Sequence, residues 1–194
     1  MHTHNGIADG ADASGGAVAS MGSIVEKAGV IGVYTVQCVG PDGQIKWEDT
    51  ADNIVTNVGK NLALDTFLAG SAYTAAVYMG LANGSASSCA VGDTMASKTT
   101  WLEVGGTNAP TYTSPRKTPS WSSASAGSKS TSAAVAFAIT SSGSVGGCFL
   151  VFGTGAVTTI DNTSGVLYSC GAFTGGTKSV SNGDTLNVQY SASM

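Results

Sequence analysis

The sequence predicts a mainly β protein: an antiparallel β-sandwich or jelly roll with one short helix and an extended N-terminal arm. Of its 194 residues 42% are hydrophobic and only 10% are charged, which suffices for the core of one domain with a surface of Ser, Thr, Asn and Gly. From residue 30 onward, short runs that alternate apolar and polar residues are separated by turn-forming residues. Only one stretch has helical spacing, so strands dominate the prediction.

The first 29 residues differ from the rest of the chain. They are rich in Gly and Ala and carry few large apolar side chains, so they cannot bury enough surface to fold alone. We expect residues 1–29 to be an extended arm that is ordered on a partner, and residues 30–194 to be the β-sandwich domain; the alternative is a disordered tail. The expected anchors on the partner are the large apolar residues Ile7, Val18, Met21, Ile24 and Val25.

A β-hairpin is predicted at the start of the domain. Residues 30–39 and 44–49 are strand-like, and Pro41-Asp42-Gly43 between them is strong turn chemistry. Residues 52–57 continue as a short strand or an extended lead-in. The stretch 58–69 follows with apolar residues near helical spacing and predicts the helix, with Asn57 as N-cap and Gly70 as the stop.

The second half of the chain predicts further strands. Residues 75–81 and 101–104 are strand-like, with a loop at 83–88 and a helical turn near 93–97 between them; three prolines in 105–119 predict a long connection. A second hairpin is expected from 131–140, a Ser-Ser-Gly-Ser turn and 145–152, and the closing strands from 165–173 and 185–191. The expected core residues are Leu62, Phe67, Val135, Phe137, Ile139, Phe149, Val151, Leu167, Leu186 and Val188.

Charge and histidine content argue against several functions. Eight basic and twelve acidic residues give a net charge of −4 without a basic cluster, so we expect no nucleic-acid partner. The two histidines, His2 and His4, leave the domain without an imidazole, and we expect neither an enzyme nor a metal or other cofactor. Glu48, Asp49 and Asp52 are the one candidate acid–base cluster, although a solvated loop is the favoured interpretation.

The expected cellular setting follows from targeting signals and cysteines. The first basic residue is Lys27, which argues against a secretion signal, and the apolar run 145–152 is too short to span a bilayer. We therefore expect no membrane association. Cys38, Cys148 and Cys170 are expected to be reduced strand residues, and Cys89 to lie in a polar loop.

The three tryptophans leave two interpretations open. Trp47, Trp101 and Trp121 are candidates for a platform on which sugars stack. Packing in the core and at interfaces explains three Trp residues equally well.

Several blocks of the domain occur in an order that indicates a family. They are residues 32–38, 47–50, 52–70, 92–97 with 101–103, 115–121, 147–150 and 182–191. In this order the chain resembles small virion proteins of tailed, podovirus-like bacteriophages and prophages. The resemblance covers about residues 30–194, and none of the blocks carries catalytic chemistry.

The resemblance implies a role as a head decoration or cement protein on the capsid surface. Its expected partners are the major capsid protein and copies of itself, and it would be made in the host cytoplasm. A low-charge β domain with an extended arm suits this role, because many attachments across a lattice raise avidity without any strong single contact. The alternative is a tail- or fibre-associated adhesin module that binds host surface glycans.

Overall fold

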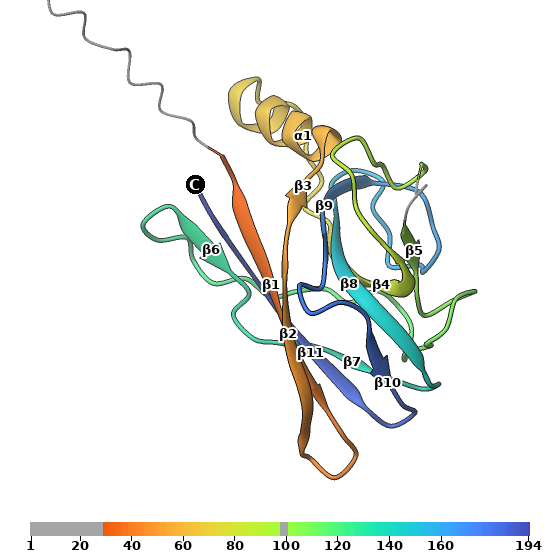
Figure 1. Ribbon diagram of the computed structural model, residues 1–194. Coiled ribbons are helices and arrows are strands. Elements are labelled where there is room, and N and C mark those ends of the chain that lie inside the picture. Colours follow the sequence, from red (N-terminus) through yellow and green to blue (C-terminus); the bar gives the residue numbers. More distant parts are fainter. Residues whose placement is uncertain (1–28, 98–100) are drawn as a thin grey trace, which may run out of the picture.

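In the computed structural model, which describes residues 29–97 and 101–194, two antiparallel sheets face each other and one helix lies at one end (Figure 1). The mainly β prediction is thereby confirmed, while the jelly-roll form stays a prediction. The first sheet has the order β2-β1-β11-β6, and β7 also pairs with β11; the second has the order β3-β9-β8-β4-β5, and β10 pairs with β8. The strands are β1 (Ile31–Val39), β2 (Ile45–Asp52), β3 (Ile54–Val55), β4 (Val77–Ser87), β5 (Trp101–Glu103), β6 (Ser128–Ser130), β7 (Val135–Ala138), β8 (Gly143–Phe152), β9 (Val166–Ala172), β10 (Lys178–Val180) and β11 (Thr185–Ser193).

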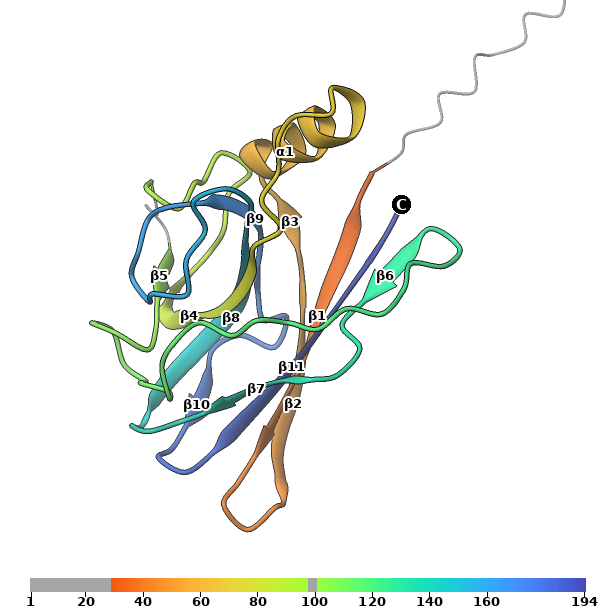
Figure 2. The ribbon, with the colours of Figure 1, turned by 180° about the vertical axis from the view of Figure 1, so that it is seen from behind.

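The first predicted hairpin is confirmed. β1 and β2 pair antiparallel, and Gly43 adopts a φ of 78° in the turn between them, a conformation that glycine takes without strain. β11 pairs with β1 along its whole length, from Ile31 opposite Ser193 to Val39 opposite Thr185. The last strand of the chain therefore lies beside the first, and the C-terminus lies near the start of β1 (Figures 1 and 2).

The second predicted hairpin is wrong. β7 pairs with β11 in the first sheet, whereas β8 pairs with β4, β9 and β10 in the second. Just after β7, the amide of Ile139 donates to the carbonyl of Asp184 at 2.8 Å, which keeps the chain on β11 before it crosses to the other sheet. Alternation showed that both segments are strands but carried no information on their partners.

Other strand boundaries also differ from expectation. The predicted loop at 83–88 is largely strand, because β4 runs to Ser87 with a register shift after Ala82. Residues 91–97 form turns without a helix. The sequence did not predict β6 and β10, which have three residues each and consist mainly of Ser and Lys.

The core has two parts, one on each face of the second sheet. Cys148 and Leu150 of β8 belong to the core shared by the two sheets, whereas the intervening Phe149 and Val151 pack with Trp101 on the opposite face. Among the predicted core residues, Leu62 is half-buried, and Phe67 is wrong because 88% of its surface is exposed. The confirmed ones are Val135, Phe137, Ile139, Phe149, Val151, Leu167, Leu186 and Val188.

The helix α1 (Asn57–Leu68) forms where expected, with its cap one residue earlier. Thr56, and not Asn57, is the N-cap, because its hydroxyl accepts from the amide of Gly59 at 3.0 Å. Gly70 follows the helix with a φ of 62°. Gly59 lies directly against the backbone of Tyr168 in β9, so a side chain at this position would collide with the strand.

Candidate partner-binding surface

The predicted anchors Ile7, Val18, Met21, Ile24 and Val25 all lie outside the described residues. The structure does describe the place where the N-terminal segment joins the domain. The amide of Gly32 in β1 donates to Asn53 Oδ1 at 2.8 Å, and Asn53 precedes α1 by four residues. The start of β1 and α1 therefore lie at the same end of the molecule, as both views show (Figures 1 and 2).

Leu64, Phe67 and Leu68 form an apolar surface on α1, here called the outer face. Their spacing of three and four residues places them on one side of the helix, and they are 54%, 88% and 75% exposed. The opposite side of α1 packs on the domain, where Gly59 contacts Tyr168 and Leu62 lies near Gly153. α1 is thus apolar on two sides, of which the domain covers only one.

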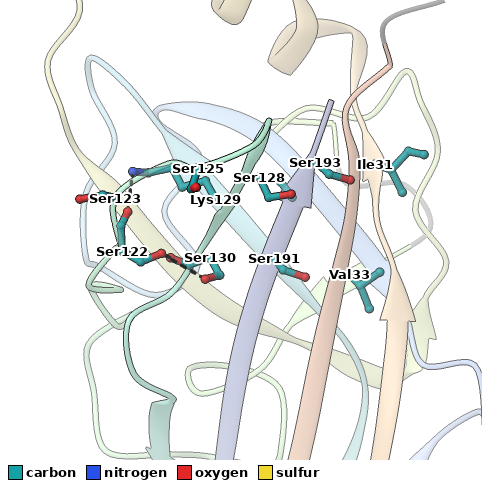
Figure 3. Close-up of a pocket in the computed structure, with 11 residues that line it drawn as sticks. Ile31, Val33, Ser122, Ser123, Ser125, Ser128, Lys129, Ser130, Ser191 and Ser193 are labelled. Carbon is teal, nitrogen blue, oxygen red and sulfur yellow. Dashed lines mark hydrogen bonds between the residues drawn. The ribbon is translucent and has the colours of Figure 1, made fainter.

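A shallow groove of about 410 Å³ opens beside the start of β1 (Figure 3). Small hydroxyl side chains from three segments face it, and Lys129 is its one charged residue. The Ser122 and Ser130 hydroxyls lie 3.1 Å apart within hydrogen-bonding distance. This groove was not predicted from the sequence, because its lining residues come from segments that are distant in the sequence and carry no recognisable motif. Its lining residues are Ile31, Val33, Ser122, Ser123, Ser125, Ser128, Lys129, Ser130, Ser191, Ala192 and Ser193.

The candidate acid–base cluster lies on strand β2 and not in the solvated loop that was expected. Glu48 accepts a hydrogen bond from Gln37 at 2.7 Å, while the neighbouring Asp49 points to the opposite face, as strand geometry requires. Asp49 pairs with Lys178 at 3.0 Å and accepts from the amide of Gly175. Burial opposes ionisation of Asp49, but these bonds outweigh it and hold the pKa below its usual value. Glu48 and Asp49 therefore tie β2 to neighbouring segments, whereas Asp52 is exposed at the end of the strand.

Two more ion pairs involve buried carboxylates. Asp184 pairs with Lys46 at 2.7 Å and accepts from the amide of Ser181. Burial alone would raise the pKa of Asp184, but these bonds outweigh it and hold the pKa below its usual value. Glu103 of β5 and Arg116 form a bidentate pair at 2.7 and 2.6 Å with both side chains fully buried. Both pairs join residues that are distant in the sequence or lie in different segments, and they hold these segments together.

The cysteines divide into two kinds. Cys38 and Cys148 are buried and free, as expected, and burial raises the pKa of Cys38 to about 11 and also raises the pKa of Cys148. Cys170 was expected to be reduced, and this is wrong because it forms a disulfide with Cys89. The amide of Asn57 donates to the carbonyl of Val91 at 2.7 Å, which holds the polar loop against this part of the second sheet and places Cys89 next to β9.

The three tryptophans pack against three different partners. Trp47 contacts Phe173, and its indole donates to the carbonyl of Ser179 at 3.0 Å. Trp101 is buried against Phe149. Trp121 contacts Tyr190 edge-on. The arrangement matches the packing interpretation and not a common stacking platform.

Residues 29–97 and 101–194 hold neither a cluster of metal ligands nor a membrane-spanning helix. No three side chains of His, Cys, Asp or Glu in this part of the chain come together as metal ligands would. Nor does this part contain a helix with the length and apolar character needed to cross a membrane. No family model, curated protein or solved structure matches the chain.

Proposed function

We propose that the protein is a bacteriophage capsid decoration or cement protein, which binds the lattice of the major capsid protein and stabilises the head. The observation that carries the proposal is the outer face of α1, an apolar surface at the end of the domain where the N-terminal segment joins. Such surfaces on a domain of low charge typically bind other proteins. The family resemblance of residues 30–194 supports the capsid as the partner.

The proposed attachment combines a rigid domain with the arm. Ile7, Val18, Met21, Ile24 and Val25 contact the major capsid protein, and neighbouring copies of the chain contribute further contacts. Burying one exposed apolar side chain contributes about 1.5–3 kcal/mol, but association and the ordering of the arm offset much of the total, so a single subunit binds weakly. Many copies on one lattice compensate through avidity.

The proposal also implies when the disulfide between Cys89 and Cys170 forms. The protein is made in the host cytoplasm, where thiols are kept reduced, so the bond between Cys89 and Cys170 closes after release from the cell, when dissolved oxygen accepts the two electrons and two protons of the thiols. The subunit on the capsid surface then gains stability once it is outside the host.

The alternative is a tail- or fibre-associated adhesin module for host surface glycans. One observation favours it: the serine-lined groove offers hydroxyl groups and Lys129 to a polar ligand. The separate packing of the three tryptophans weighs against it, because glycan sites commonly use exposed aromatic rings. Binding of the purified protein to a glycan array, abolished by Lys129→Ala together with Ser130→Val, would support the adhesin.

An attachment assay tests the capsid role. Purified heads that lack this protein are mixed with the full chain, with a chain that lacks residues 1–25, and with Ile45→Ser as a control at an exposed position in β2. We expect the full chain and the control to sediment with the heads, and the truncated chain to stay in solution as a folded domain with a cooperative unfolding transition. A truncated chain that still saturates the heads would contradict the proposed attachment.

A further inference from the structure

The outer face of α1 is an exposed apolar surface that the described part of the domain does not cover. Phe67 and Leu68 lie in the last turn of the helix and are 88% and 75% exposed, so they contribute little to the packing of the domain. Lys60 and Asp65 are the charged residues of α1; Lys60 lies one turn before Leu64 on the same side, so the outer face is apolar from Leu64 to the end of the helix. A helix of 12 residues gains most of its stability from packing, and here Gly59 is its one fully buried residue.

The segment that precedes β1 has side chains that fit this surface. Its large apolar residues are concentrated toward the domain, in Val18, Met21, Ile24 and Val25, with Ala and Gly between several of them. The described chain starts at Gly29, and the hydrogen bond between Gly32 and Asn53 holds this start beside the lead-in to α1. The segment therefore leaves the domain at the end that carries the outer face.

The segment is also long enough to reach it. An extended chain spans about 3.3 Å per residue, which gives Val25 a reach of about 13 Å and Val18 a reach of about 36 Å from Gly29. The outer face begins about 10 Å and ends about 17 Å along α1 from its first residue, at 1.5 Å per residue. A short tether of this kind gives an effective concentration in the millimolar range, which favours the same chain over a second copy.

We propose that, in the free subunit, residues 18–25 pack on the outer face of α1 of the same chain. The inference does not depend on the capsid role, because it concerns the isolated protein. Where both hold, the lattice must take this segment from α1, so attachment is an exchange of one apolar contact for another. The free subunit thereby covers Phe67 and Leu68 and does not expose them to aggregation.

Hydrogen exchange on the full chain tests the contact from the side of the helix. Ile24→Ser together with Val25→Ser is compared with the unaltered protein and with Ile7→Ser, a control outside the proposed segment. We expect the amides of residues 64–68 to exchange at least tenfold faster in the double variant, as loss of about 1.4 kcal/mol would produce. The exchange rates of the β1 and β11 amides should be unchanged in the double variant, which would show that the domain stays folded. In the Ile7→Ser control, the exchange rates of residues 64–68 should also be unchanged.

Trypsin cleavage after Lys27 tests the contact from the other side. Phe67→Ser together with Leu68→Ser, both exposed in the domain, should speed this cleavage several-fold, whereas Ile45→Ser should not. Exchange at 64–68 should also be the same at low and at fifty-fold higher protein concentration. Unchanged rates in both variants would overturn the contact, and protection that grows with concentration would overturn the same-chain assignment in favour of a second copy.

Discussion

Replacing Arg116 by Met should lower the free energy of unfolding by about 3–5 kcal/mol, the usual cost of removing one partner of a buried ion pair. The guanidinium makes two bonds to Glu103, at 2.7 and 2.6 Å, and one each to the carbonyls of Val157 and Asn162, at 3.2 and 2.7 Å. Both charged side chains are fully buried, so solvent does not screen the loss. The variant leaves a buried carboxylate without its cation.

Urea denaturation, followed by tryptophan fluorescence, measures this loss. Arg116→Lys is the matched control, because it keeps the charge but loses the bidentate geometry. Its free energy of unfolding should lie between those of the unaltered protein and Arg116→Met. The double variant Glu103→Leu with Arg116→Met should lose less than the two single variants added together, by at least about 1.5 kcal/mol. A loss below about 1 kcal/mol for Arg116→Met, or additive losses in the single variants, would contradict a stabilising role of the Glu103–Arg116 pair.

Three further predictions concern stability. Cys89→Ser should cost about 4.5 kcal/mol by the chain-entropy estimate, since the disulfide closes a separation of 81 residues, and oxidised protein should show two thiols on unfolding, not four. Asp49 and Asp184 have pKa values below usual in the folded state, so the stability that they contribute is complete above about pH 4 and is lost as the pH falls through their folded pKa values; unfolding measured between pH 7 and pH 2 should show this, and a flat profile would contradict it. Gly59→Ala should cost about 1–3 kcal/mol because its side chain meets the backbone of Tyr168, whereas the control Gly92→Ala, with open space around it, should be neutral in thermal unfolding.

The sequence predicted strands well where alternation and turn chemistry agreed, as in β1 and β2. It failed where the pairing partner mattered: 131–140 and 145–152 have a plausible turn between them, yet β7 and β8 belong to different sheets. Helical spacing likewise located α1 but did not show which of its two apolar sides the domain covers. Phe67 was therefore assigned to the core although it lies on the outer face.

Contacts between residues that are distant in the chain could not be predicted from the sequence. Arg116 lies in a segment that reads as a surface connection, and only the fold brings its guanidinium against Glu103 in β5. The Cys89–Cys170 bond joins a polar loop to a buried strand, a pair that residue type and spacing do not single out. The expected anchors in the arm, by contrast, rest on composition alone and stay a prediction.

We propose above that this chain binds the capsid lattice through its N-terminal arm. Cryo-electron microscopy of the assembled particle tests it most directly, because it locates the chain and shows what residues 1–29 contact. We expect density on the head, with the arm against the major capsid protein and the two-sheet domain bridging neighbouring subunits. Density confined to the tail or fibres, with the domain projecting outward, would contradict it.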